Sequence, residues 1–237
     1  GLTTCSDGKI SACVNNTGCN KWEPEHKCSL NKCENSTNCK SDGWIDVSAG
    51  YYKCGINGSG ELYCWKDSPY PEKISDRTDW SKVYVSSNDP SLSYFCAIAS
   101  GELYCMGHNA NGELGDGTDV SKTEMVRIGS RSDWSDISTY YFISNNNYGY
   151  ATCGIAGGEL FCWGDGILSP KKMGTKTDWQ KITGNCGIAS GKIFCWETLS
   201  SQPEQIGNRE DWDQTTSDPY SEDNKYLCAL SSGELYC

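Results

Sequence analysis

Cysteine is the residue type whose spacing in this chain points most directly to a definite chemistry. Ten of the sixteen cysteines fall into five pairs, and four of these pairs enclose eight residues each, as in Cys96-AIASGELY-Cys105. No Cys-x-x-Cys pair occurs, which argues against a zinc ribbon or a thiol redox motif. An even number of cysteines at this density is typical of disulfides formed in an oxidising compartment. The expected chemistry is therefore cross-linking within a secreted or cell-surface protein.

Residues that would support catalysis are sparse. The only two histidines are His26 and His108, which excludes a three-histidine zinc site and leaves little for a Ser-His-Asp triad. Nothing among the 31 acidic residues singles out a catalytic carboxylate pair. Asp116, Asp119 and Asp165 lie in glycine-rich segments and are a minor calcium alternative, but they lack the alternating ligand spacing of an EF-hand. We expect no enzymatic activity and no cofactor.

The charge of the chain restricts its partners. A net charge of -11 would repel a phosphate backbone, so nucleic acid and anionic membrane surfaces are not expected as partners. No apolar run approaches the roughly 18 residues that span a bilayer, and we identify no secretory leader. The chain is interpreted as a mature secreted protein or a soluble ectodomain. Three glycosylation acceptor patterns, at Asn15, Asn35 and Asn57, agree with this.

An internal repeat positions these cysteines. Each cysteine pair follows a tryptophan that is usually preceded by aspartate, and several units close with a Pro-x-x-apolar step such as Pro203-EQ-Ile206. Short runs rich in β-branched and aromatic residues alternate with Gly, Ser, Asn and Asp, which predicts four strands per unit. A four-stranded unit of about 40 residues is the signature of a β-propeller. The predicted fold is therefore all-β, a propeller of four-stranded antiparallel blades.

The geometry of the repeated hairpin predicts its disulfide. If Ser100 and Gly101 form a two-residue turn, Ala99 faces Glu102 and Cys96 faces Cys105. The two cysteines then form a non-hydrogen-bonded pair with alpha carbons about 4.5 Å apart, which suits a disulfide. The same counting predicts the pairs Cys153–Cys162, Cys186–Cys195 and Cys228–Cys237, while Cys54 and Cys64 fit a three-residue turn, so that one bond per blade is expected.

Two sequence features resemble a known family. The segment from Cys105 to Thr118, CMGHNANGELGDGT, resembles the Gly-x-x-x-x-Gly-Gln-Leu-Gly signature of the regulator-of-chromosome-condensation-like repeat, with Glu113 in the place of glutamine. The Cys-Trp-Gly run that starts at Cys162 is similar to the cysteine-rich extracellular version of plant crinkly-type receptor ectodomains. The resemblance covers about residues 44–237 and implies a propeller that presents loops to partners. Acidic charge and disulfides argue against a nuclear role.

The number of blades depends on the N-terminal segment. Residues 44–237 contain five repeats, and the last repeat stops at its third strand. Residues 1–43 contain six further cysteines, whose 15 possible pairings the sequence leaves open: Cys5, Cys13, Cys19, Cys28, Cys33 and Cys39. We favour six blades in one compact domain, with residues 1–43 completing the propeller. Five blades with a cysteine-rich N-terminal cap is the alternative.

Loop lengths indicate where a ligand would bind. The loops that follow the first and third strands of each unit emerge on one face, and they carry the large length variation, including residues 135–152 and 106–123. Loops on a rigid scaffold commonly carry function, and mixtures of Tyr, Asn and Asp suit recognition. The candidate ligand-binding residues are Tyr94, Asn109, Asn111, Tyr140, Tyr141, Asn145, Asn146, Asn147, Tyr148, Tyr150, Asp218, Tyr220, Asp223 and Asn224.

These features lead to one functional hypothesis and one alternative. We expect a recognition module for an extracellular protein or a glycan, with Asn57 on the opposite face, so that a glycan there leaves the binding surface free. We interpret the repeated tryptophans as core residues packed between blades, and sugar stacking is the alternative interpretation: Trp65, Trp163 and Trp196. The alternative function is a self-assembling structural subunit of an extracellular coat, filament or appendage.

Overall fold

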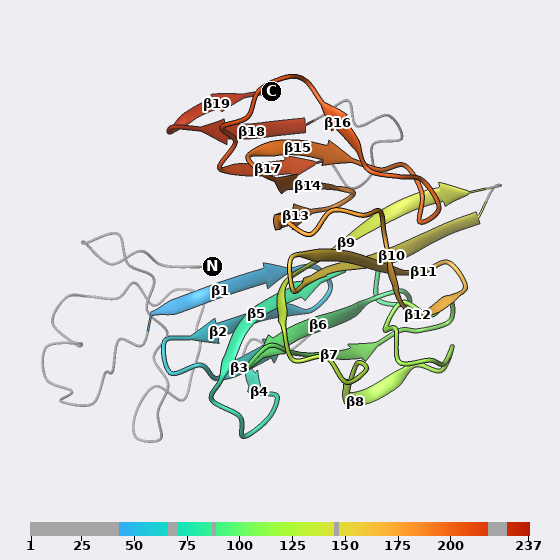
Figure 1. The fold of residues 1–237 in the computed structure, drawn as a ribbon. Helices are drawn as coiled ribbons and strands as arrows, with labels where there is room; N and C mark the ends of the chain where they lie inside the picture. Colours follow the sequence, from blue (N-terminus) through green and yellow to red (C-terminus); the bar gives the residue numbers. More distant parts are fainter. Residues whose placement is uncertain (1–42, 66–70, 87–88, 145–146, 218–226) are drawn as a thin grey trace, which may run out of the picture.

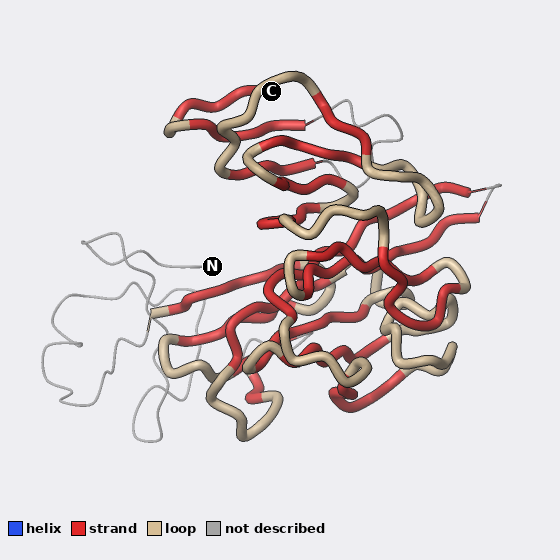
Figure 2. The backbone as a smooth tube through the Cα atoms, in the orientation of Figure 1, coloured by secondary structure: helices blue, strands red, loops and turns tan. Residues whose placement is uncertain are grey.

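A computed structural model describes residues 43–65, 71–86, 89–144, 147–217 and 227–237 of this chain. The described residues form strands, turns and loops and contain no helix (Figures 1 and 2). The strands are β1 (Trp44–Ala49), β2 (Lys53–Asn57), β3 (Leu62–Trp65), β4 (Glu72–Lys73), β5 (Trp80–Val85), β6 (Tyr94–Ala99), β7 (Glu102–Gly107), β8 (Lys122–Arg127), β9 (Trp134–Ser144), β10 (Asn147–Ala156), β11 (Glu159–Gly164), β12 (Ile167–Lys172), β13 (Trp179–Thr183), β14 (Cys186–Ala189), β15 (Lys192–Cys195), β16 (Glu204–Ile206), β17 (Gln214–Ser217), β18 (Leu227–Ser231) and β19 (Glu234–Tyr236).

The strands form five antiparallel sheets, each built from consecutive strands. The first four sheets have four strands in chain order, β1 to β4, β5 to β8, β9 to β12 and β13 to β16, and the fifth has three, β17 to β19. The first strand of each sheet packs against the first strand of the next, which makes each sheet a propeller blade. The all-β propeller is confirmed. The prediction of six blades is wrong for the described chain, which has five, and residues 1–42 lie outside the described residues.

The repeated hairpin has the predicted register. Ala99 pairs with Glu102 and Cys96 with Cys105, and both turn residues have positive φ, 48° at Ser100 and 76° at Gly101. Positive φ at both central positions is the geometry of the tight turn that matches strand twist. The five predicted disulfides are present, each with alpha carbons 4.1 Å apart: Cys54–Cys64, Cys96–Cys105, Cys153–Cys162, Cys186–Cys195 and Cys228–Cys237.

The third blade differs from the sequence-based expectation. Residues 135–152 were expected to form a long loop, but most of them extend β9 and β10 into a long hairpin. Tyr140 pairs with Ala151 and Tyr141 pairs with Tyr150 across the two strands. Aromatic and β-branched residues pack well on a pleated surface, so this segment lengthens the sheet where asparagines suggested a loop.

The core lies between the blades. Ile56 and Leu62 of the first blade pack with Val83 and Phe95 of the second in one buried cluster. Polar contacts cross the same boundaries, because a carboxylate oxygen of Asp46 accepts a hydrogen bond from the N–H of Val83 at 2.7 Å. Two of the repeated tryptophans, Trp163 and Trp196, are 0% and 1% exposed, which agrees with the interblade interpretation; Trp65 is half-buried.

Candidate functional site

The two faces of the propeller differ in how tightly they are constrained. The face that carries the hairpin turns, here called the turn face, repeats one backbone contact at four blade boundaries. The N–H of the repeat tryptophan donates to a glycine carbonyl in the hairpin of the preceding blade, at 2.9 to 3.0 Å: Trp80 to Gly60, Trp134 to Gly101, Trp179 to Gly158 and Trp212 to Gly191. The opposite face, here called the loop face, carries the connections after the first and third strands. Its connections differ in length, from two residues between β11 and β12 to fourteen between β7 and β8.

Two loops of neighbouring blades join on the loop face. The N–H of Gly117 donates to the carbonyl of Leu168 at 2.8 Å, and the N–H of Gly166 donates to the carbonyl of Asn111 at 2.9 Å. The indole N–H of Trp163 reaches the carbonyl of Glu113 at 2.8 Å. Residues 108–121 and 165–168 therefore form one continuous surface across the second and third blades, here called the loop platform.

Buried Asn109 fixes the shape of the longer loop. Its side-chain oxygen accepts a hydrogen bond from the N–H of Leu114 at 2.8 Å, and its amide nitrogen donates to the carbonyls of Thr118 at 2.9 Å and Val120 at 3.2 Å. Asn109 is 0% exposed. Its side chain thus replaces the backbone bonds that a loop of this length lacks, which keeps the platform rigid.

Asp116 closes the same loop from the other end. Its carboxylate accepts hydrogen bonds from the N–H and the hydroxyl of Thr118, at 2.9 and 2.7 Å, and it lies 3.0 Å from the ammonium of Lys122. Partial burial acts to raise the pKa of Asp116, but the bonds from Thr118 and Lys122 outweigh it and lower the pKa below its usual value. Because this carboxylate is already engaged, it is a poor candidate for a calcium ligand.

Glu113 contacts Asn111 of the platform from the buried side. It is 1% exposed, and its carboxylate accepts bonds from the backbone N–H and the side-chain amide of Asn111 at 2.9 and 3.0 Å. One of its oxygens lies 3.2 Å from Nδ1 of His108. Glu113 therefore makes the contacts of a structural residue, and its position in the family-like segment does not place it at the surface.

The exposed part of the loop platform combines apolar and acidic side chains. Val120 is 58% exposed and Leu168 is 36% exposed, and Asp119 and Asp165 are exposed as well. Partial burial of its carboxyl group raises the pKa of Asp165. No sequence pattern singled out Val120 or Leu168, because one apolar residue in a polar segment belongs to no periodic pattern.

Several predicted ligand-binding residues lie in the interior, and their assignment to the surface is corrected here. Tyr94 and Asn109 are 0% exposed, Tyr140 is 2% exposed and Tyr150 is 6% exposed. The hydroxyl of Tyr94 is 2.7 Å from the hydroxyl of Thr152, within the buried interface of the second and third blades. The three tyrosines point inward because strand alternation places them on faces that neighbouring blades cover, whereas the side chain of Asn109 is buried inside its own loop.

The other predicted residues have different outcomes. Asn111 is exposed on the loop platform, and Tyr141 is half-buried with its ring 5.3 Å from that of Tyr150. The backbone of Asn147 and Tyr148 belongs to β10. The remaining candidates lie outside the described residues and stay predictions: Asn145, Asn146, Asp218, Tyr220, Asp223 and Asn224.

Asn57 lies at the hairpin of the first blade, on the turn face, as expected. Its side-chain oxygen accepts hydrogen bonds from the N–H groups of Ser59 and Glu61, and its amide nitrogen donates to the Glu61 carboxylate at 2.9 Å. Asn57 as a whole residue is 8% exposed. These contacts give Asn57 a turn-stabilising role and leave its amide nitrogen poorly placed for a glycan. Asn15 and Asn35 lie outside the described residues.

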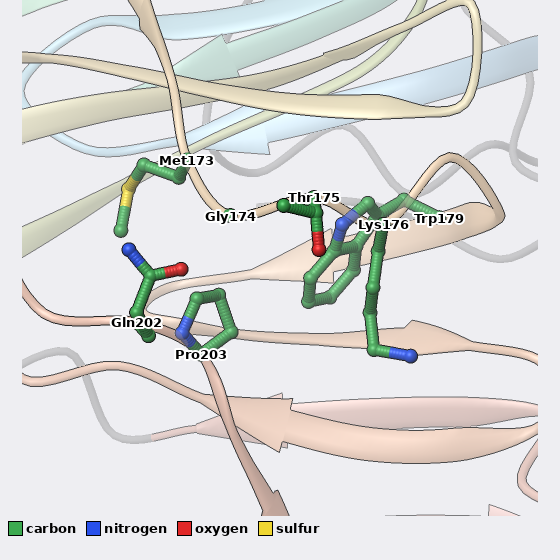
Figure 3. A pocket seen from close by; sticks show the side chains of 7 residues that line it. All are labelled: Met173, Gly174, Thr175, Lys176, Trp179, Gln202 and Pro203. Carbon is green, nitrogen blue, oxygen red and sulfur yellow. The ribbon is translucent and has the colours of Figure 1, made fainter.

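A small hollow lies beside the linker between the third and fourth blades. Its volume is about 140 Å³, and Figure 3 shows Gln202 and Pro203 facing Met173 and Gly174 across it. The hollow also touches Thr175, Lys176 and Trp179. The ammonium of Lys176 lies 4.2 Å from the centre of the Phe194 ring, so it is already engaged. Small-molecule sites usually enclose roughly 300 to 1,000 Å³, so the hollow does not suit such a ligand.

Comparison with known structures identifies the fold. No protein-family model matches the sequence. The chain is similar to the crystal structure of human WBSCR16, with a TM-score of 0.61, 14% identity, and coverage of 81% of this chain and 61% of that one. It is also similar to Prp20p from Saccharomyces cerevisiae, described with its binding properties to Gsp1p and histones, with a TM-score of 0.55, 12% identity, and coverage of 74% of this chain and 54% of that one.

A further structure, of Kap60 bound to yeast RCC1 (Prp20), matches with a TM-score of 0.50 and 10% identity over 76% of this chain and 52% of that one. The chain therefore spans between half and two thirds of the length of the structures it matches. At these identities the likeness establishes the fold, which is an RCC1-like β-propeller carrying disulfide-linked hairpins.

Proposed function

We propose that this protein is a non-enzymatic extracellular recognition module that binds a protein ligand through the loop platform. The observation that carries the proposal is the platform itself, in which backbone hydrogen bonds between two blades join the loop that contains exposed Val120 to the strand end that contains exposed Leu168. A preorganised surface loses little conformational entropy on binding, so even a few apolar contacts contribute usefully to affinity.

The chemistry of the platform indicates a ligand segment that is apolar and basic. Val120 and Leu168 offer apolar area, and Asp119 and Asp165 add carboxylates on the same surface. The net charge of -11 would steer a basic partner towards the protein and repel an acidic one.

A protein ligand is favoured over a glycan. Sugar binding commonly uses exposed aromatic rings, but Trp163, Trp196 and Tyr94 are buried between blades. The yeast propeller of similar fold is described with Gsp1p, histones and Kap60 as binding partners, which supports a protein partner only at the level of the fold. The disulfide of each described blade supports an extracellular location.

An array of extracellular proteins, printed beside an array of glycans, tests the proposal. We expect the native protein to bind one or more proteins, and we expect the double variant Val120→Arg, Leu168→Arg to weaken that binding roughly tenfold or more, as loss of central interface contacts does. Ile206→Arg is the matched control, because Ile206 is 41% exposed but lies in the outer strand β16. Protein binding that the double variant leaves intact would refute the site, and binding to glycans alone would refute the ligand class.

A structural subunit of an extracellular assembly is the second candidate function. It is favoured by apolar side chains left exposed at both ends of the row of blades, with Val47 and Leu235 each 67% exposed. Light scattering under native conditions separates the two candidates, because a recognition module remains a small species and an assembly subunit forms large polymers as concentration rises.

A further inference from the structure

The repeat tryptophan of the fourth blade places its indole N–H at a hollow. In the second blade, the indole N–H of Trp80 donates to the hydroxyl of Ser75 at 3.1 Å. Ser75 lies five residues before Trp80, and the residue five positions before Trp179 is Gly174, which has no hydroxyl. The indole N–H of Trp179 has no acceptor among the described residues, although Trp179 is only 4% exposed. A buried donor without an acceptor costs free energy, so an oxygen from outside the described chain would stabilise it.

The hollow lies on the side of Gly174 where a side chain would be. Trp179 and Gly174 both line the hollow of about 140 Å³ beside the linker of the third and fourth blades (Figure 3). A Cβ at Gly174 would lie 3.3 Å from Oε1 of Gln202 and 3.5 Å from Cδ of Pro203, which form the opposite wall. Cavities of about 150 Å³ hold a molecule the size of benzene. The hollow therefore suits a group as large as one amino-acid side chain.

A lysine without a carboxylate partner lines the same hollow. The four linkers between blades each carry a cation three residues before the tryptophan. Three of these cations form ion pairs with the aspartate two residues further on, at 2.6 to 2.7 Å: Arg77–Asp79, Arg131–Asp133 and Arg209–Asp211. The fourth cation is Lys176, which forms no ion pair with a described residue. The corresponding aspartate, Asp178, accepts a hydrogen bond from the hydroxyl of Ser190.

The charge of Lys176 is available to an anion. Its ammonium lies 4.2 Å from the centre of the Phe194 ring, and that ring lies 5.7 Å from the ring of Trp179. The contact with the ring face orients the ammonium but supplies no counterion. The described residues that line the hollow include no acidic side chain. Because the lysine stem is flexible, the ammonium can reach a group that sits in the hollow.

We propose that this hollow binds a carboxylate on a short apolar stem, the chemistry of an aspartate or glutamate side chain. The indole N–H of Trp179 and the ammonium of Lys176 donate to the carboxylate oxygens, and Met173 and Pro203 contact the stem. Hydrogen bonds to a charged group are stronger than those to a neutral one, so a neutral ligand of the same shape binds more weakly. The site shares no residue with the loop platform and does not depend on the function proposed for it.

Titration of the native protein with propionate, at constant pH and ionic strength, tests the proposal through the indole signals of proton–nitrogen correlation spectra. We expect the Trp179 signal, identified by through-bond correlation with its own backbone amide, to shift and to saturate in the millimolar range. Trp134 is the internal control, because its buried indole N–H also lacks a described acceptor but the neighbouring cation, Arg131, is paired with Asp133. No shift at Trp179, as an ordered water alone would give, or an equal shift at Trp134 would overturn the proposal.

Two comparisons test the role of charge at the hollow. Propionamide has the shape of propionate without its charge, and we expect the native protein to bind it about tenfold more weakly. The variant Lys176→Gln should weaken propionate binding to a similar extent, whereas Arg131→Gln, at the equivalent position of the preceding linker, should leave it unchanged. Equal binding of propionamide and propionate would contradict the proposal even if Lys176→Gln failed to fold. Propionate binding that a folded Lys176→Gln variant retains in full would contradict it as well.

A third ligand separates two sources of the carboxylate. The blocked tripeptide acetyl-Ala-Glu-Ala-amide carries the same group on a chain with no other charge. Tighter binding of the tripeptide than of propionate would assign the hollow to an acidic side chain of a protein partner, and the reverse order would assign it to a free carboxylic acid. Both orders support a carboxylate site, and failure of both ligands to move the Trp179 signal would overturn it.

Discussion

The backbone contact between successive blades predicts a large difference between two glycines that occupy equivalent turns. Gly101 has a φ of 76°, and a Cβ built on it would lie 2.2 Å from the carbonyl oxygen of Ser132 in the linker to the next blade. Gly233 has a φ of 81°, and its Cβ would meet no described atom within 4 Å. The substitutions Gly101→Ala and Gly233→Ala thus share the backbone strain and differ in the interblade contact.

The expected magnitudes follow from these distances. A left-handed conformation costs an alanine about 1–2 kcal/mol, and this term applies to both variants. In Gly101→Ala the linker must also move by about 1 Å, which breaks the hydrogen bond from the N–H of Trp134 to the carbonyl of Gly101 at 2.9 Å. A lost buried hydrogen bond adds about 1–2 kcal/mol, before any loss of interblade packing. We expect Gly101→Ala to lower the free energy of unfolding by about 3 kcal/mol, and Gly233→Ala by about half of that.

Guanidinium unfolding followed by tryptophan fluorescence measures both variants, with the disulfides kept intact. The blade-boundary tryptophans are natural reporters, because Trp80 and Trp134 are buried. Equal destabilisation by the two substitutions would refute the reasoning, since it would mean that the hairpin of the second blade is no more constrained by its neighbour than that of the last. A larger effect at Gly233 would show that an undescribed part of the molecule covers the fifth blade.

Three further predictions concern charge and cross-links. Asp136→Ala leaves a buried strand N–H of the fourth blade without its acceptor, so we expect a loss of about 1–3 kcal/mol on denaturation, partly restored in Asp136→Asn. The Arg77 guanidinium is the main cause that lowers the pKa of Asp79 to about 2. Stability from this pair is present above the unfolded pKa and is lost as the pH falls from about 4 to 2, so Asp79→Asn should flatten the pH dependence of stability in that window. The double variant Cys96→Ser, Cys105→Ser should lose about 2–3 kcal/mol, the entropy of closing a ten-residue loop, and thermal unfolding measures it.

Local signals in the sequence predict most of the fold. The register of the second-blade hairpin follows from counting outwards from Ser100 and Gly101, and each of the five described disulfides follows from counting outwards from the turn of its own hairpin. Each of these depends on residues within ten positions of one another. The number of blades does not depend on such local signals, because it is set by contacts between segments that are distant in the sequence. The sequence-based preference for six blades was wrong for the described chain, which has five.

The candidate site was harder to predict, for reasons that single residues illustrate. Tyr150 carries a polar hydroxyl in an asparagine-rich segment, yet strand pairing places it 6% exposed between two blades. Asn109 has the composition of a surface turn, but its amide replaces missing backbone bonds inside the loop. Val120 and Leu168 became candidate ligand contacts only because backbone hydrogen bonds join the two segments that carry them into one surface. Side-chain direction and contacts between loops are tertiary properties, and a linear pattern does not contain them.

The division between the two faces separates the contacts that hold the blades together from the side chains that the proposed ligand would meet. On the turn face, each hairpin glycine from Gly60 to Gly191 holds the next blade by a backbone bond, and a side chain at Gly101 would collide with the linker. On the loop platform, the bonds that join the blades also run between backbone groups, from Gly117 to Leu168 and from Gly166 to Asn111. Because these bonds do not involve the exposed side chains, residues such as Val120 are free to change without loss of the platform. The surface chemistry of the platform, and with it the proposed ligand specificity, can therefore change while the turn face and the disulfides preserve the fold.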